Sequence, residues 1–421
     1  MILCLFEDDQ VAHLEPLTLT RAVYHLHLGV STLAETTRYH FGNTETVQHC
    51  RTELRAVTAE EQPWPLELPE GADVLFVNGR LVLNQGPLLD RLKMAARPGE
   101  PPRLFVQGDE LVAAWIPSAR ASLLDARAIT RATFEGVPEE RVEGARLIGR
   151  LWHLIRELAT EIVSGYERLT RNVNVLEREG VRISPGAILA EPERIYTGPG
   201  VTIRPGAILN AENGPIYVGS DSTIFEGAVI RGPTYIGPRC EIRTGANIEG
   251  SSFGYYCKLG GEILNSVFHS LSSKPHAGFL GHAYIGRWCN LGAETNNSNL
   301  RNDYSFVKIY NSVIKGFEIS DQNFLGVFMG DHAKCGITTM YNTGTVVGTF
   351  CNLFGAGFHA HYLPPFTWGG PNEGGYTDYR IDKALKVAEV VMARRGRVLT
   401  DAERELLTAI YEASRNEAPL A

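Results

Sequence analysis

The sequence predicts an α/β N-terminal domain, then a left-handed parallel β-helix built from hexapeptide repeats, and finally a C-terminal helical appendage. Three observations predict this fold class: short apolar runs near the N-terminus, a six-residue periodicity in the middle, and a helix-capping pattern near the end. With 421 residues, 44% of them hydrophobic, the chain exceeds what one core normally serves and is able to fill two.

The six-residue periodicity indicates the β-helix. A helix needs apolar residues every three or four positions and a strand every two, whereas a period of six places one inward residue on each flat face of a triangular coil. Glycine and proline at the corners, as in Ile183-Ser-Pro-Gly-Ala187, permit the sharp bends. The aliphatic positions are Val218, Ile224, Ile230, Ile236, Ile242 and Ile248, and the small positions are Ser222, Ala228, Thr234, Cys240 and Ala246.

The register continues on both sides of this core. Further turns are expected from Ile319 and Leu325 and from Val347 and Leu353. The interruptions near 265–282 and 296–318 are longer than a corner requires, so loops are expected there. Loops on a rigid scaffold often carry function.

The predicted domains are an α/β domain at 1–120, a connecting helical region at 121–178, the β-helix at 179–370 and C-terminal helices at 371–421. Apolar runs at 2–6, 74–77 and 104–106 are typical of buried parallel strands. Apolar residues at helical spacing over 148–162 predict the connecting helix. Thr400 and Glu403 form a capping box that predicts a late helix.

Composition excludes several classes of function. The net charge of −8 without a basic run argues against a nucleic-acid partner. No apolar stretch is long enough to span a membrane and no signal peptide is recognised, so a cytoplasmic protein is expected. The seven cysteines show no CxxC spacing, which favours buried free thiols over a zinc site or a redox pair.

One segment resembles a known family. Lys274-Pro-His-Ala-Gly-Phe279, followed by Gly281-His-Ala-Tyr-Ile-Gly286 and Asn290-Leu-Gly-Ala293, is similar to the acetyltransferase segment of the bifunctional bacterial enzymes that acetylate glucosamine 1-phosphate and then uridylylate it. The resemblance implies that His276 is the general base. It also implies that Asn290 and Asn299 bind the sugar and that Phe279 lies beside the sugar phosphate.

The chemistry of acetyl transfer suits a histidine. An amine that attacks a thioester must lose a proton, and imidazole titrates near the operating pH. A lone loop histidine is more often a solvated side chain, but the surrounding match favours His276, whereas His269 and His282 lack it and are interpreted as structural. Lys274 is a candidate for binding the sugar phosphate or coenzyme A, although surface lysines are more often solvated.

The N-terminal part resembles sugar nucleotidyltransferases in Pro16-Leu-Thr-Leu-Thr-Arg21, Gly29 and Leu33-Ala-Glu35, but Glu7–Glu15 stands where that family has a glycine-rich loop. In one interpretation Asp8 and Asp9, beside Glu7, hold Mg²⁺ while Arg21 and Arg80 neutralise phosphates. Asn78-Gly-Arg80 closes a strand where that family has a magnesium-binding aspartate, so Arg80 is expected to face the nucleotide, and Asn78 is a further candidate for binding the substrate. In the other interpretation the domain only binds a sugar nucleotide or organises the oligomer.

The sequence therefore predicts an acetyl-CoA-dependent N-acetyltransferase acting on glucosamine 1-phosphate, with uridylyl transfer from UTP by the N-terminal domain. A homotrimer is also expected, because an isolated prism exposes three flat faces and the resemblance implies that three prisms pack side by side. Three alternatives remain: a monofunctional sugar acyltransferase, a non-catalytic nucleotide-sugar-binding protein and a purely structural β-helix.

Overall fold

The chain forms two compact units in the computed structural model, which describes residues 1–177, 179–372 and 374–420. The first unit comprises Met1–Leu14, Thr20–Leu26 and Ser31–Arg150. The second comprises Glu15–Leu19, His27–Val30 and the chain from Leu151 onward. Two short N-terminal segments therefore belong to the same unit as the β-helix.

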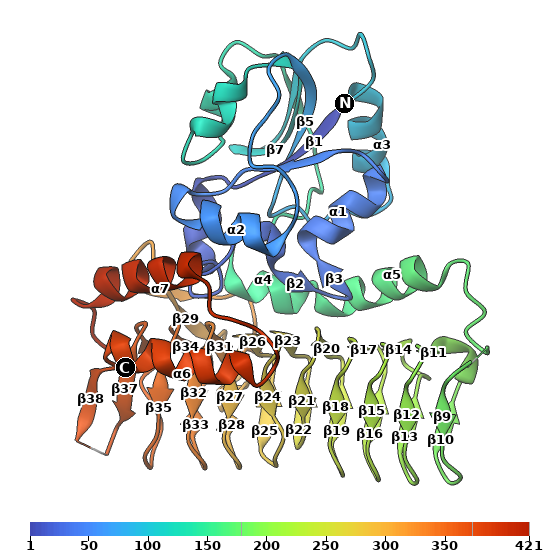
Figure 1. The fold of residues 1–421 in the computed structure, drawn as a ribbon, viewed down its shortest axis with the longest axis vertical. Helices are drawn as coiled ribbons and strands as arrows, with labels where there is room; N and C mark the ends of the chain where they lie inside the picture. Colours follow the sequence, from blue (N-terminus) through green and yellow to red (C-terminus); the bar gives the residue numbers. More distant parts are fainter. Residues whose placement is uncertain (178, 373, 421) are drawn as a thin grey trace. The chain divides into compact units, whose positions relative to one another are not determined.

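The first unit is built on a six-stranded mixed sheet (Figure 1). Strands β4, β1 and β5 are mutually parallel, whereas β7 runs antiparallel to both β5 and β6. The sheet order is β4 (Thr46–Gln48), β1 (Ile2–Phe6), β5 (Ala72–Asn78), β7 (Glu110–Ala119), β6 (Arg103–Gln107) and β8 (Glu139–Arg141). The unit's α-helices are α1 (Leu33–Phe41), α2 (Arg55–Glu61) and α3 (Pro87–Ala95).

The three predicted strands exist, but their surroundings differ in part from the prediction. The parallel arrangement holds for β1 and β5, whereas β6 turns directly into the antiparallel strand β7 through Gly108 and Asp109. Gly108 adopts a φ of 58°, which suits the tight turn of a hairpin. The unit also extends to Arg150 rather than ending near 120, because β8 completes the sheet beside β6.

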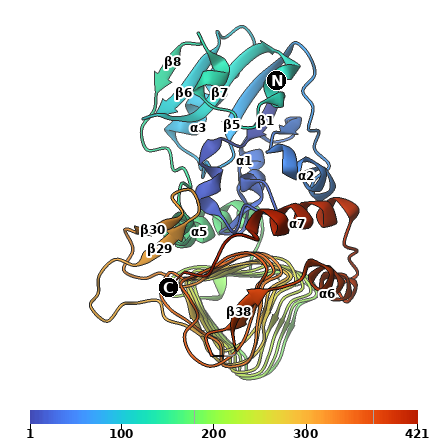
Figure 2. The same cartoon turned by 90° about the vertical axis from the view of Figure 1, so that its left-hand side faces the viewer.

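The second unit contains the predicted left-handed parallel β-helix, whose triangular section is visible in Figure 2. The three faces of the β-helix are three sheets, which we call sheets D, E and F. Sheet E contains β10 (Ile188–Ala190), β13 (Ile208–Asn210), β16 (Val229–Arg231), β19 (Asn247–Glu249), β22 (Glu262–Leu264) and β25 (Phe279–Gly281). Sheet F contains β11 (Ile195–Thr197), β14 (Ile216–Val218), β17 (Thr234–Ile236), β20 (Ser252–Phe253), β23 (Val267–Ser270), β26 (Tyr284–Arg287), β31 (Phe328–Met329), β34 (Val346–Val347) and β36 (Tyr362–Leu363).

Sheet D, the third face, closes each coil and ends in an antiparallel pair, β37 with β38. Its strands are β9 (Arg182–Ile183), β12 (Thr202–Ile203), β15 (Thr223–Ile224), β18 (Glu241–Ile242), β21 (Lys258–Leu259), β24 (Ser273–Lys274), β27 (Asn290–Leu291), β32 (Lys334–Cys335), β35 (Asn352–Leu353), β37 (Thr367–Gly370) and β38 (Gly375–Asp378).

The six-residue register is confirmed by burial. All six aliphatic residues from Val218 to Ile248 are fully buried, and the small positions between them are buried too. Each strand lies directly on its equivalent in the next coil, as Ile224 on β15 pairs with Ile242 on β18. The seven cysteines are all buried and free, as predicted.

The two predicted interruptions have different outcomes. Residues 265–282 form regular strands β23, β24 and β25, so the expected loop there is wrong. The polar residue Lys274 hides the register, because it occupies a position that is aliphatic in the preceding coil. Residues 296–318 do leave the coil after β28 (Asn296–Asn297) and carry an antiparallel hairpin, β29 (Lys308–Asn311) with β30 (Gly316–Ile319), so Ile319 is 66% exposed rather than part of a coil.

Helices α4 (Leu151–Arg156) and α5 (Leu158–Thr170) confirm the helical pattern predicted over 148–162. The N-terminal segment His27–Val30 packs on α5 through two glycines. A Cβ on Gly29 would lie 2.5 Å from the backbone of Glu161, and one on Gly165 would lie 2.3 Å from Val30 Cγ2. Ser252 Oγ on β20 donates to the Gly29 carbonyl, so this segment is also bound to sheet F.

The C-terminal appendage contains α6 (Ile381–Ala393) and α7 (Asp401–Ser414). The predicted capping box is present: Glu403 N donates to Thr400 Oγ1 at 3.1 Å and Thr400 N donates to Glu403 Oε2 at 2.9 Å. Among the described residues, no helix has both the length and the apolar character needed to cross a bilayer.

Candidate functional site

His276 lies at a corner of the β-helix, in the four residues 275–278 that join β24 on sheet D to β25 on sheet E. Its side chain is exposed. The sequence predicted a histidine on an extended loop. The structure places it on a short corner between β24 and β25, each of which pairs with a strand of the preceding coil. A corner of this kind holds its backbone more firmly than a long loop does.

Asn290 and Phe279 lie on the two sheets that meet at this corner. Asn290 is exposed on β27 and pairs with Ser273, which begins the strand leading to His276. Phe279 is half-buried at the start of β25, immediately after the corner. The structure therefore places two of the predicted sugar-binding residues on either side of His276.

Asn299 lies at the other end of β25, beside Gly281. A Cβ on Gly281 would lie 2.6 Å from both Asn299 Nδ2 and Phe279 Cζ, so these two side chains converge over Gly281. The glycine leaves room that a larger residue would fill. Phe279 and Asn299 thus form one surface beside the corner.

Asn296 and Asn297, on β28, have a structural role. Asn296 Oδ1 accepts from Phe279 N at 2.7 Å, and Asn297 Oδ1 accepts from Gly281 N at 3.0 Å. Their side-chain amides continue the ladder of sheet E where the main chain departs into the insertion.

His282 is a neighbour of this surface that sequence reasoning set aside. Its Nδ1 lies 2.9 Å from Asn299 Nδ2 and its Nε2 lies 3.3 Å from Asn265 Nδ2, while its ring stacks on Phe324. Burial lowers the pKa of His282 to about 4, so the imidazole is neutral and orients the Asn299 amide. The coil register, which stacks residue 282 above residue 265, was the signal available for this contact.

Lys274 does not face a substrate, which corrects its predicted role. It is fully buried, in register with Leu259 of the preceding coil. Its Nζ donates to the carbonyl oxygens of Gly260 (3.3 Å), His276 (3.1 Å), Ala277 (3.4 Å) and Gly278 (2.8 Å). Burial lowers the pKa of Lys274 to about 8.

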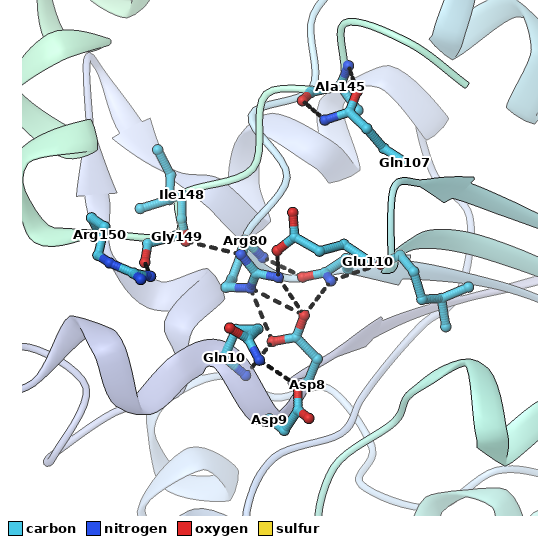
Figure 3. Close-up of polar contacts among 12 residues, drawn as sticks. Asp8, Asp9, Gln10, Arg80, Gln107, Glu110, Ala145, Ile148, Gly149 and Arg150 are labelled. Carbon is cyan, nitrogen blue, oxygen red and sulfur yellow. Dashed lines mark hydrogen bonds and ion pairs between the residues drawn. The ribbon is translucent and has the colours of Figure 1, made fainter. Parts of the chain in front are cut away.

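In the first unit, Arg80 is the centre of a buried ion-pair network (Figure 3). Its Nη2 lies 2.6 Å from Asp8 Oδ2 and 2.7 Å from Glu110 Oε1, and its Nε lies 2.9 Å from Asp8 Oδ1. Burial lowers the pKa of Arg80, but the bonds to Asp8 and Glu110 outweigh that cost and raise it above its ordinary value. Arg80 is therefore neutralised by protein carboxylates rather than directed at a phosphate.

Asn78 belongs to the same network. Its Nδ2 donates to Asp8 Oδ2 and to the Leu111 carbonyl, both at 2.8 Å, and its Oδ1 accepts from Arg80 N at 2.9 Å. The amide is thus fully engaged. Arg21, the other predicted phosphate-binding arginine, is 1% exposed.

The carboxylates expected to hold Mg²⁺ have different surroundings and partners. Glu7 is buried and bonds to Arg51 and to Val23 N, Asp8 bonds to Arg80, and Asp9 is exposed. In the described part of the chain, no group of three or more histidine, cysteine, aspartate or glutamate side chains is arranged to hold a metal. Because the Asp8 oxygens already accept from Arg80 and Asn78, these residues do not fit a protein-held Mg²⁺.

A pocket of about 360 Å³ adjoins this network. Arg131 lines it but pairs with Glu139 at 2.8 Å. An acidic lining repels an anionic triphosphate, so the pocket's charge is opposite to that of a phosphate site. The lining residues are Asp8, Asp9, Gln10, Asp109, Glu110, Leu111, Ile129, Thr130, Arg131 and Ala132.

Comparison with known proteins finds similarity to sugar nucleotidyl transferases and to bifunctional GlmU proteins. Residues 3–174 match the sugar nucleotidyl transferase family. The chain is 36% identical over 90 residues to the bifunctional protein GlmU of Methanocaldococcus jannaschii, which covers 21% of each chain. It is 28% identical over 187 residues to the GlmU of Pelobacter propionicus, covering 38% of each chain.

A third relative, from Sulfurisphaera tokodaii, is a bifunctional sugar-1-phosphate nucleotidylyltransferase/acetyltransferase. It is 33% identical over 94 residues, which cover 22% of this chain and 23% of that one. The chain thus spans only about a fifth of the length of the first curated relatives it matches. The resemblance to bifunctional sugar-phosphate transferases is confirmed, and the N-terminal part matches the sugar nucleotidyl transferase family model.

Proposed function

We propose that the β-helix of this chain transfers an acetyl group from acetyl-CoA to the amino group of an amino-sugar 1-phosphate, with glucosamine 1-phosphate as the first candidate. The observation that carries the proposal is the exposed His276 on a fixed corner, with Asn290 and Phe279 on the two sheets that meet there. The similarity to bifunctional nucleotidylyltransferase/acetyltransferases supports the same chemistry.

The proposed reaction needs one proton acceptor. The sugar amine attacks the thioester carbonyl, forming an N–C bond, and the C–S bond breaks to release coenzyme A. His276 accepts the proton that the amine loses and returns it to the departing thiolate. Asn290, Asn299 and Phe279 would orient the sugar, since asparagine amides bond hydroxyl groups and an aromatic ring covers the apolar face of a sugar.

Product analysis tests this proposal directly. Purified protein is incubated with acetyl-CoA and glucosamine 1-phosphate, and the expected result is a product heavier by one acetyl group, with free thiol released in equal amount. Galactosamine 1-phosphate and glucosamine 6-phosphate, offered separately, test the choice of sugar. Absence of thiol release with every amino sugar phosphate would contradict acetyl transfer.

We infer nucleotidyl transfer from UTP as a second activity, supported by the match of residues 3–174. The alternative, a domain that binds without catalysis, is supported by the buried Arg80 network and the acidic pocket. Mg²⁺ enters this proposal only as the ion that accompanies the triphosphate of UTP.

Pyrophosphate release separates the two interpretations. An active domain should release pyrophosphate from UTP and N-acetylglucosamine 1-phosphate with Mg²⁺ and lose that activity when Mg²⁺ is chelated. Asp9→Asn should reduce the release about tenfold or more if this exposed carboxylate takes part. If no nucleoside triphosphate yields pyrophosphate, the domain is a binding or assembly module.

We also propose that three copies associate through the β-helix. Six large apolar side chains of the insertion after β28 are exposed, and exposed apolar surface of this kind often marks an interface. These side chains are Tyr304, Phe306, Val313, Ile314, Ile319 and Phe324. Residues from a neighbouring copy would then complete the sugar site.

A further inference from the structure

The buried lysine beneath the His276 corner is unexpected for the core of a β-helix. The position of Lys274 is Ile242 and Leu259 in the two preceding coils. An aliphatic residue would continue this column, whereas burying an ammonium costs several kcal/mol unless it is well bonded. Stability of the coil therefore does not explain the lysine.

The lysine is bonded mainly to the corner that it precedes. Of the four carbonyl oxygens within hydrogen-bond distance of Nζ, three belong to the corner: those of His276, Ala277 and Gly278. The fourth belongs to Gly260 of the preceding coil. Charge-assisted bonds of this kind are about twice as strong as neutral ones.

Gly261 provides the space for this ammonium group. Ala246, Gly261 and Gly278 occupy equivalent corner positions in successive coils, as the ladder bonds from Asn247 N to Gly261 O and from Glu262 N to Gly278 O show. A Cβ on Gly261 would lie 2.9 Å from Lys274 Nζ and 2.6 Å from the Gly278 carbonyl oxygen. The alanine of this corner position is thus replaced by glycine in the coil whose corner lies beside the Lys274 ammonium group.

We propose that Lys274 is a positioning residue that fixes the backbone of residues 276–278 from inside the prism and thereby sets the direction of the His276 imidazole. This inference rests on the proposed acetyl transfer, because the direction of the His276 imidazole matters only if His276 accepts a proton in that reaction. Lys274 itself does not touch the substrate, since it is fully buried. Its effect on the reaction passes through His276.

The test replaces the ammonium group with an apolar group of similar length. Lys274→Met should lower kcat for acetyl transfer by about tenfold or more, because small misplacements of a reacting group are costly, while KM for both substrates changes less than threefold. The matched control is Lys258→Met on the outer face of β21, whose Nζ pairs with Glu241 at 2.8 Å. The control should retain wild-type kcat.

A double-mutant cycle distinguishes positioning from a general loss of stability. In a His276→Ala background, Lys274→Met should have no further effect on kcat, because the group that it positions is already absent. Additive losses, or a kcat within twofold of wild type in the single variant, would overturn the proposal. If Lys274→Met does not fold, Lys274→Gln replaces it, and failure of both to fold would assign the lysine to coil stability and overturn the proposal too.

Amide hydrogen exchange provides a readout that does not depend on the activity. Peptides covering residues 275–281 should exchange faster in Lys274→Met than in Lys258→Met, while peptides from other coils stay unchanged. Unchanged exchange at the corner would overturn the positioning role. Absence of acetyl transfer in the wild type would instead contradict the proposed function and leave this measurement valid.

Discussion

At the residue scale, burial distinguishes the roles of residues that the sequence alone does not distinguish. His276 and Lys274 are two positions apart in the motif, yet one is exposed and the other fully buried. Arg80 and Arg127 are both arginines of the first unit, but Arg80 is 0% exposed and Arg127 is 74% exposed. The same residue type therefore serves either the core or the surface.

Replacing His276 by alanine should lower acetyl transfer by at least about a hundredfold, the minimum expected for losing a general base. Because the side chain is exposed, the variant should melt at the wild-type temperature. The rate of thiol release from acetyl-CoA measures the effect. A variant with wild-type turnover on every accepted amino sugar would show that another group accepts the proton.

Lys274 should make stability depend on pH. The native pKa is about 8 against an ordinary value of 10.5, so the unfolded chain binds this proton more strongly over that interval. Burial of the charged Lys274 ammonium lowers the free energy of unfolding. This destabilisation is fully present below pH 8 and disappears above pH 10.5, so stability rises with pH in between. Urea unfolding at pH 7, 8.5 and 10 should show the wild type gaining stability relative to Lys274→Met. A constant difference between the two proteins would contradict a depressed pKa.

At the element scale, the apolar pattern of the sequence determines where strands and helices form. Polar and small residues then determine how these elements contact one another. The Arg80 network connects the ends of β1 and β5 with the start of β7 through Asp8 and Glu110. Gly29 and Gly165 let an N-terminal segment lie directly against α5. Neither arrangement follows from strand or helix periodicity.

Arg80→Leu should destabilise the protein by about 3–5 kcal/mol, because it leaves the Asp8 carboxylate buried without its partner. Arg127→Ala removes the exposed pair with Glu53 and should cost less than about 1 kcal/mol. Denaturant unfolding of both variants provides the comparison. Equal effects would show that the Asp8–Arg80 pair is accessible to water, as a phosphate-binding arginine would need to be.

At the scale of the whole molecule, the two units combine different kinds of order. The first is a mixed sheet whose strands meet from distant parts of the sequence, and the second repeats one coil. The repeat gives each coil only its neighbours for support, whereas the insertion after β28 breaks the repeat and exposes apolar side chains. These are the side chains that the proposed association would cover.

Light scattering should report a mass near three times the 46.4 kDa of one chain. Exposed apolar side chains and flat prism faces favour such association. Phe306→Asp together with Ile319→Asp, both in the insertion, should shift the protein towards the monomer without unfolding it, since these side chains are 51% and 66% exposed. A clean wild-type monomer at micromolar concentration would contradict association and sites shared between copies.

The sequence by itself determined the β-helix, because a six-residue period has one geometric interpretation and each coil repeats it. It also determined the α4–α5 pattern and the capping box at Thr400 and Glu403, since helical spacing and capping are local properties. The His276 motif was recognisable for the same reason, being contiguous in the chain.

Only the tertiary structure decided which polar residues are buried and what they contact. Lys274 resembled a surface lysine, and Asp8 resembled a metal ligand, until the folded chain placed carbonyl oxygens around one and Arg80 beside the other. Asp8 and Arg80 lie far apart in sequence and meet through strand order. The Lys274 partners at residues 276–278 are close in sequence, but the ammonium group reaches them only because the side chain is buried inside the coil. Local periodicity carries no information about such contacts, because it records which face a residue occupies and not what lies opposite.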